Sequence, residues 1–175
     1  MTLHEITEAV RIFVREHEAW GPPIVFVLAF GESLAFISLL LPATVILFGI
    51  GALIGESGLA FWPEWAAAAV GAALGDWLSY WIGYKFKDRV MEIWPLSRHP
   101  QIIERGRAFF RRWGAAAVFI GRFFGPLRAS VPLVAGIFGM PLLTFQLFNV
   151  ASALLWATAV LAPGTFGVRW LLENF

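Results

Sequence analysis

The chain has 175 residues, of which 59% are hydrophobic and 14% are charged, and its formal net charge is +1. Soluble domains carry about 25% charged residues, so the composition excludes an ordinary soluble domain and predicts an integral membrane protein of one domain. The absence of cysteine excludes a disulfide framework and thiolate metal or redox chemistry.

The first expected element is an amphipathic helix. Apolar residues recur at helical spacing over residues 3–18, which is typical of a helix that lies in the membrane interface. The acidic residues in the same stretch are atypical of a cleaved signal peptide. We therefore expect no targeting segment.

Two apolar segments follow. Residues 19–41 are apolar apart from Glu32, and Pro42 interrupts the run. The sequence GLAFWPEW at 58–65 is expected to form an interfacial turn, because Trp is enriched where the membrane meets water. A membrane span is then expected over residues 66–84.

A basic segment lies in the middle of the chain. Eight of the 13 Lys and Arg residues lie between Lys85 and Arg112, against three acidic residues. The positive-inside rule therefore places this segment in the cytoplasm. Apolar side chains from Ile102 to Trp113 share one helical face, and the arginines beside them can reach lipid headgroups.

The last third of the chain carries almost no charge. Residues 129–168 contain no Asp, Glu, Lys or Arg, and this run is about twice the length that one span needs. We therefore expect it to cross or re-enter the membrane more than once. The sequence GMP at 139–141 predicts a break before a span over residues 142–161. Upstream of it, Arg122 and Arg128 lie in an otherwise apolar segment.

The two halves of the chain match each other at a shift of 90 residues. The shift pairs Gly31 with Gly121, Glu32 with Arg122, Pro42 with Pro132, Phe48 with Phe138 and Gly49 with Gly139. We therefore predict an all-α polytopic membrane protein of two inverted repeats, each with an amphipathic helix, a re-entrant helical hairpin and a transmembrane helix. The single domain covers residues 1–175, with repeat 1 over about 1–84, an amphipathic cytoplasmic loop over 85–112 and repeat 2 over about 113–175.

Proline and glycine are expected to break the helices inside each hairpin. Proline lacks the N–H that a continuous helix needs, and broken backbone at membrane depth is tolerated only where it faces protein or a watered cavity. The residues expected to break the hairpins are Pro42, Pro126, Pro132, Gly49, Gly136 and Gly139. The opposite charges Glu32 and Arg122 would then lie on opposing hairpins, where they either neutralise each other or act on a substrate between them.

Three segments of the chain resemble one family. GRFFGPLRASVPLVAGIFGM, GDWLSYWIGYKF and GESLAFISLLLPATVILFGIGAL resemble the motifs of the DedA family, also called VTT or SNARE-associated membrane proteins. The likeness runs from about Phe30 to Trp156 in the family's order. It implies two facing re-entrant hairpins and a multi-pass protein of the bacterial inner (cytoplasmic) membrane. It also implies a proton-coupled flippase or scramblase that moves phosphate-bearing lipids, such as undecaprenyl phosphate or phospholipids, between leaflets.

The resemblance assigns roles to three charged residues. The family's two essential arginines fall on Arg122 and Arg128, which would bind the substrate phosphate, and its first membrane-embedded acid falls on Glu32. The chemistry agrees, because the planar guanidinium of arginine binds phosphate through two parallel hydrogen bonds. Helix starts within a broken hairpin would add backbone N–H donors.

This chain departs from the family at the second acid. That position falls on residues 42–44, where this chain has Thr44 at the end of the step. Either proton coupling is weaker here or Asp76 supplies the second carboxylate for proton coupling or charge pairing. Tyr80 shares a helix face with Asp76 and is expected to be a structural hydrogen-bond partner, so Thr44 and Tyr80 are supporting residues.

The same residues allow other interpretations. The two arginines can pair with Glu32 and Asp76 in a structural network that binds no substrate. A small proton-coupled ion or drug antiporter would use the same acids, and a membrane scaffold would transport nothing. An enzyme is not expected, because His4, His17 and His99 lie in peripheral segments and no metal-ligand spacing is present in the sequence.

The expected partners follow from the lipid interpretation. They are membrane lipids with phosphate headgroups, and protons. We expect no nucleic-acid partner, no cofactor and no metal, and the sequence is compatible with a homo-oligomer.

Overall fold

The computed structural model describes residues 12, 16–34, 43–87, 89, 100–124, 128 and 130–174. Every regular element in these ranges is a helix, as the predicted all-α class requires. The helix α9 (Leu142–Asn174) is the one among them that is long and apolar enough to cross a membrane, over Leu142–Leu171.

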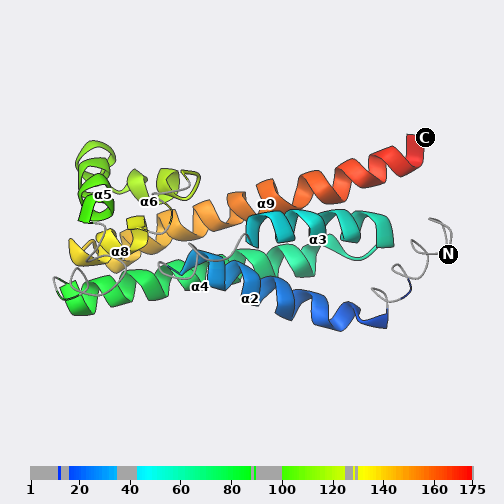
Figure 1. Cartoon of the computed structure of the whole chain (residues 1–175), viewed down its shortest axis with the longest axis horizontal. Helices are drawn as coiled ribbons and strands as arrows, with labels where there is room; N and C mark the ends of the chain where they lie inside the picture. The colour runs from blue at the N-terminus through cyan, green and yellow to red at the C-terminus, as the bar shows by residue number, and fades with distance from the viewer. Residues whose placement is uncertain are drawn as a thin grey trace.

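Two long helices form the axis of the molecule (Figure 1). Besides α9, the described helices are η1 (Glu18–Trp20), α2 (Gly21–Ser33), α3 (Ala43–Ser57), α4 (Phe61–Phe86), α5 (Pro100–Trp113), α6 (Ala116–Gly121) and α8 (Ser130–Ile137). The long pair is α4 and α9, which run antiparallel. Trp65 of α4 donates a hydrogen bond to Thr158 of α9 at 2.9 Å, and Asn149 of α9 donates to the carbonyl of Ala73 of α4 at 2.9 Å.

The helix α2 packs along α4 in the same direction. The glycines Gly71 and Gly75 of α4 lie against the backbone carbonyls of Phe26 and Phe30 of α2, where an added Cβ would be 2.5 and 2.6 Å from the oxygens. Only glycine allows backbones this close, which is how small residues work between membrane helices.

The helix α3 packs along α9 by the same device. Gly51 and Gly55 of α3 lie against the carbonyls of Leu161 and Thr165 of α9. The hydroxyl of Thr165 donates to the carbonyl of Gly51 at 2.9 Å. Since α4 and α9 are antiparallel, α2 and α3 also run in opposite directions.

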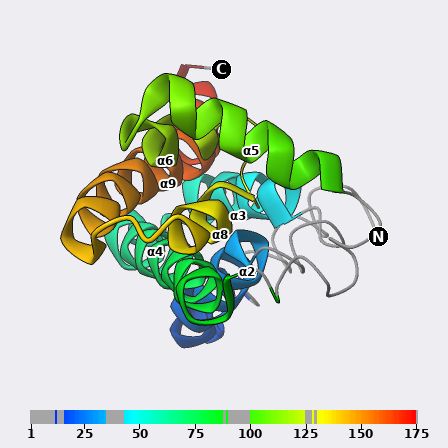
Figure 2. The same ribbon diagram turned by 90° about the vertical axis from the view of Figure 1, so that its left-hand side faces the viewer.

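The second half of the chain makes the corresponding contacts at the other end. The helix α8 packs on α4 and α6 packs on α9. The helix α5 lies across this end, over α8 and α6, rather than along the bundle axis (Figures 1 and 2).

Two helices are longer than the sequence predicts. The helix α4 begins at Phe61, inside the expected interfacial turn, because Pro63 lies in the first turn, where its missing N–H is not needed. The helix α9 continues past residue 161 and through Pro163 to Asn174. Gly164 next to it lies against the backbone of α3, so tertiary packing outweighs the local interruption.

The hairpin-breaking residues are only partly where the sequence predicts them. Gly139 lies at the break between α8 and α9 and has φ of +67°. In contrast, Gly49 and Gly136 lie inside α3 and α8, and Pro132 lies in the first turn of α8. The expectation that these three break a helix is wrong. Gly136 is instead a packing residue, because an added Cβ would be 2.0 Å from the carbonyl oxygen of Tyr80.

Several predictions fall on residues that are not described. Pro42 and Pro126 lie outside the described residues, as do most of the expected helix over 3–18 and part of the basic loop over 85–112. The helical part of that loop is α5, where the sequence predicts a helical face.

Candidate substrate site

Four charged side chains, those of Glu32, Asp76, Arg122 and Arg128, lie where the short helices end against the long pair. Glu32 lies in the last turn of α2, and Arg122 directly follows α6. Asp76 lies in the middle of α4. These three residues are between 3% and 5% exposed. Charges buried to this extent must be paired, because desolvation of an isolated charge is very costly.

Arg122 has the most complete set of partners. Its Nη2 donates to the carboxylate of Asp76, and the two side chains are 1% and 4% exposed. The same nitrogen donates to Oδ1 of Asn149 at 2.7 Å, while Nε donates to Oγ of Ser152 at 3.0 Å. Two nitrogens of one planar group are therefore held, which fixes the plane of the guanidinium.

Asn149 and Ser152 hold Arg122 and were missed by the sequence analysis. Asn149 is itself fixed between the long helices, because its Nδ2 donates to Ala73 of α4 and to Gln146 of α9, at 2.9 and 3.1 Å. The signal was present: the polar residues at 146, 149 and 152 recur every three positions in an apolar helix. That spacing places them on one face.

Arg128 forms the second pair. Its Nη1 donates to Oε1 of Glu32 at 2.5 Å, and the hydroxyl of Thr44 donates to the same oxygen. The Cζ of Arg128 lies 4.6 Å from the ring centroid of Trp156 on α9. An aromatic face at this distance stabilises the cation. Thr44, which stands where the resemblance leads one to expect a second acid, is thus a hydrogen-bond donor to Glu32.

The pairing differs from the one that the repeat suggests. Glu32 contacts Arg128 rather than Arg122, and Arg122 contacts Asp76. The repeat gives Glu32 and Arg122 the same place in the two halves of the chain, and residues in corresponding places need not be in contact. The two pairs form one electrostatic unit, since Arg128 also interacts through space with Asp76 and Arg122.

The network leaves hydrogen-bonding capacity unused. Within the described part of the chain, buried atoms without a hydrogen-bond partner include Nη1 of Arg122, Nε and Nη2 of Arg128, Oε2 of Glu32 and Oδ1 of Asp76. Unpaired buried polar atoms are rare in native proteins and each needs a reason. Three guanidinium nitrogens with free donors are what a small multivalent oxyanion requires.

Tyr80 lies outside this network. Its hydroxyl donates to the carbonyl of Met140 at 2.6 Å, and its ring stacks on Phe145 at 4.3 Å between centroids. It therefore ties α4 to the break that precedes α9. Among the described residues, no cluster of three or more His, Cys, Asp or Glu could hold a metal ion.

Comparisons with known proteins agree with the motifs. The profile of the VTT domain matches residues 41–166. The chain is 35% identical over 152 residues to inner membrane protein YabI of Escherichia coli (strain K12), with 87% of this chain and 60% of the relative covered. Inner membrane proteins YghB and YqjA of the same strain are 33% and 30% identical, with 81% of this chain and 65% and 64% of the relatives covered.

The chain thus spans about three fifths of the length of these curated relatives. No solved structure matches it.

Proposed function

Because the chain belongs to the VTT domain (DedA) family of membrane proteins, we propose that it moves phosphate-bearing lipids between the leaflets of a bacterial inner membrane. Undecaprenyl phosphate and glycerophospholipids are the substrate classes. Arg122 and Arg128 bind the headgroup phosphate, while Glu32 and Asp76 are their counter-ions at rest.

The observation that carries the proposal is the set of free donors on the two arginines. Three guanidinium nitrogens have no partner in the described structure, although Arg122 is 4% exposed. Charge-assisted hydrogen bonds from guanidinium to phosphate are among the strongest in proteins. A phosphate between the two side chains would accept these donors without disturbing those that already hold Arg122.

The arrangement of the helices supports two inverted re-entrant hairpins. In the first half, α2 packs on α4 and α3 on α9; in the second half, α6 packs on α9 and α8 on α4. The second set of contacts is the first set with α4 and α9 exchanged. At roughly 1.5 Å per residue, the 13 residues of α2 extend about 20 Å, which is less than the roughly 30 Å of the hydrocarbon core. A helix of this length does not cross alone, which supports a path in which each short pair enters and returns, with polar groups meeting at the tips.

Protons enter the proposal through the carboxylates beside the arginines. A phosphate that binds the free nitrogens of Arg128 lies next to Glu32, whose Oε2 has no hydrogen-bond partner among the described residues. Two anions in one buried site repel each other, and a proton carried with the lipid neutralises one of them. Substrate binding and proton uptake by Glu32 or Asp76 are thereby coupled. The variant Glu32→Gln should move lipid at a rate that no longer depends on a pH gradient.

The test of the phosphate site is a matched set of arginine-to-lysine variants. Purified protein is reconstituted in liposomes, and leaflet-to-leaflet movement of labelled phospholipid and undecaprenyl phosphate is measured. Lysine keeps the charge and loses the planar fork, so Arg122→Lys and Arg128→Lys should slow movement about tenfold or more, which corresponds to about 1.4 kcal/mol. Arg111→Lys, the same change on the exposed face of α5, is the control.

Other outcomes would favour the other functions. Equal activity of all three lysine variants would show that no bidentate phosphate site is used. If the wild-type protein moves an ion or drug in exchange for protons, and lipid phosphates do not compete with that substrate, the antiporter is the correct function. Folded protein that moves neither would be a scaffold.

A further inference from the structure

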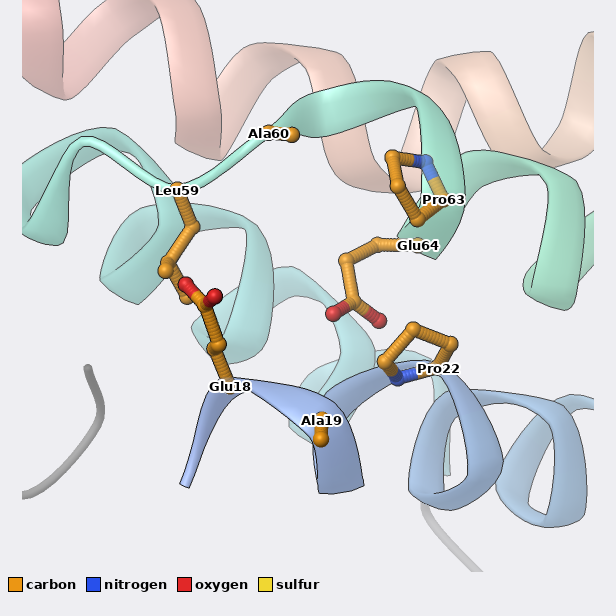
Figure 3. A pocket seen from close by; sticks show the side chains of 7 residues that line it. All are labelled: Glu18, Ala19, Pro22, Leu59, Ala60, Pro63 and Glu64. Atoms are coloured by element: carbon orange, nitrogen blue, oxygen red, sulfur yellow. The ribbon is translucent and has the colours of Figure 1, made fainter. Parts of the chain in front are cut away.

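A pocket with two carboxylates lies at the end of the bundle opposite to α5. It has a volume of about 240 Å³ and opens between η1, the start of α2 and the start of α4 (Figures 1 and 3). Its walls are mainly apolar and include Pro22, Leu59 and Pro63, and its two charged groups are the carboxylates of Glu18 and Glu64. It shares no residue with the site around Arg122 and Arg128.

Glu64 is the unusual residue of this pocket. It is only 4% exposed, yet its Oε2 has no hydrogen-bond partner within the described ranges. Figure 3 shows its carboxylate directed into the pocket toward Pro22, with the side chain of Glu18 on the other side. A carboxylate that is buried and unpaired calls for a missing partner.

The carboxylate of Glu64 occupies space that a glycine on α2 leaves free. A Cβ added at Gly21 would lie 2.1 Å from Oε1 of Glu64, so glycine leaves the space that the carboxylate occupies. The start of α2 also carries the positive end of that helix dipole. A side chain at position 21 would therefore displace the carboxylate, whose Oε2 is buried and has no partner among the described residues.

We propose that this pocket binds a primary ammonium group, with Glu64 as its principal counter-ion and Glu18 as the second. Two carboxylates supply acceptors for N–H donors, and the proline and leucine walls suit the carbon atoms beside the nitrogen. A hard metal ion fits less well, because it takes six or more oxygen ligands and these walls offer few. Among the described residues no acid cluster has the geometry of a metal site.

The surroundings indicate where the amine comes from. Trp20, Trp62 and Trp170 are 65%, 69% and 58% exposed, and all three belong to segments at this end of the bundle (Figure 1). Exposed tryptophans gather at the level of the lipid headgroups. An amine in the pocket is therefore either a lipid headgroup or a soluble amine that reaches the same depth.

The protonation of Glu64 sets the direction of the pH dependence. Glu64 precedes the apolar segment 66–84, and burial raises its pKa to about 7. Among the described residues, the charged or titratable groups around it are Glu18 and His17 beside the start of α2 and Arg169 of α9, which donates to the carbonyl of Leu59 at 2.8 Å. The deprotonated carboxylate binds a cation, so amine binding should strengthen as the pH rises from about 6 to about 8.

The proposal is tested with propylammonium chloride and the full chain in neutral detergent. Thermal unfolding is followed by Trp fluorescence, with sodium chloride and tetramethylammonium chloride at the same concentration as references. Propylammonium should raise the midpoint with increasing concentration, as a ligand of the folded state does. Tetramethylammonium has no N–H donor and should not. A shift equal for all three salts, or no shift, would overturn the proposal.

Variants assign the effect to the pocket. Glu64→Gln should raise the apparent Kd for propylammonium at least about tenfold, and Glu18→Gln should raise it less. Gly21→Ala, which displaces the Glu64 carboxylate, tests the same site if Glu64→Gln does not fold. Glu173→Gln removes an exposed acid of the same end and should bind normally. Unchanged binding in the three pocket variants would refute the assignment.

Two further arms separate the sources and the sites. Vesicles of phosphatidylcholine alone, and of phosphatidylcholine with phosphatidylethanolamine, are titrated into the same assay. If only the vesicles that contain phosphatidylethanolamine compete with propylammonium, the ligand is a lipid amine. If neither competes while propylammonium still binds, the ligand is a soluble amine. The arginine variant Arg122→Lys should keep full amine binding, so failure of lipid movement and failure of this pocket are distinguishable.

Discussion

The sharpest prediction concerns the pair of Arg122 and Asp76. In Asp76→Ala the guanidinium loses its counter-ion while it remains 1% exposed. Removal of one partner of a buried pair costs about 3–5 kcal/mol, because the other charge is left uncompensated. Arg122 keeps its bonds to Asn149 and Ser152, so we expect the lower end, about 3 kcal/mol. Asp76→Asn keeps an acceptor and should cost less.

A double-mutant cycle separates the charge from the packing. In Asp76→Ala with Arg122→Met both charges are absent, and the double variant should recover most of the loss, since apolar replacement of a whole buried pair is close to neutral. Stability is measured by reversible denaturant unfolding in mixed micelles. A coupling energy below about 0.5 kcal/mol, with the single variant within about 1 kcal/mol of wild type, would refute this account of the pair.

Three further predictions use the same unfolding assay and the transport assay. Gly136→Ala places a Cβ 2.0 Å from a backbone carbonyl and should destabilise by about 2 kcal/mol or more. Gly49→Ala has open space within 4 Å and should gain up to about 1 kcal/mol from helix propensity; equal effects would contradict the packing. Tyr80→Phe should cost about 1 kcal/mol because a carbonyl loses its donor, with lipid movement unchanged if the role is structural. Thr44→Val removes the hydroxyl bonded to Glu32 and should cost about 1 kcal/mol, whereas Thr44→Ser should restore stability; a Thr44→Ser variant as unstable as Thr44→Val would rule out the hydroxyl as the cause.

The charged members of the site could be predicted because charge is conspicuous in an apolar sequence. Arg122, Arg128 and Glu32 each interrupt a run that is otherwise long and apolar, and Asp76 lies within an expected span. A charge in such a position needs a partner or a substrate. The structure brings all four together in two pairs.

The partners of those charges were harder to predict. An internal repeat relates Glu32 to Arg122 by position, but contact depends on how the short helices approach α4 and α9. Gly75 lets α2 come close to α4 beside Asp76, and this approach depends on backbone proximity that a pattern of charges does not contain. Neutral polar residues such as Asn149 carry no charge, so their only mark in the sequence is the three-residue spacing with Gln146 and Ser152.

Helix ends were predicted poorly for a related reason. Pro163 and Gly164 together are typical of a helix end, yet α9 continues through them. The glycine allows the backbone of α3 to lie within contact of α9, and the contact stabilises the helix across the proline. Local propensity is a weak guide wherever tertiary packing supplies more free energy than the interruption removes.

The number of free donors argues that the buried arginines serve more than architecture. An ion pair that only held helices together would need one or two N–H groups from each cation, which lysine supplies with its three donors. Here two nitrogens of Arg122 are anchored and fix the plane of the group, while Nη1 has no partner in the described structure. Arg128 is positioned by Glu32 and by the face of Trp156, and two of its nitrogens have no hydrogen-bond partner among the residues that the structure describes. Groups that are rigidly held and still unsatisfied are preorganised for a ligand, because binding then loses little side-chain entropy. The lysine variants are informative for this reason: they keep the positive charge of each residue and lose the planar fork of N–H donors, so they test whether the arrangement of donors, rather than charge alone, is needed.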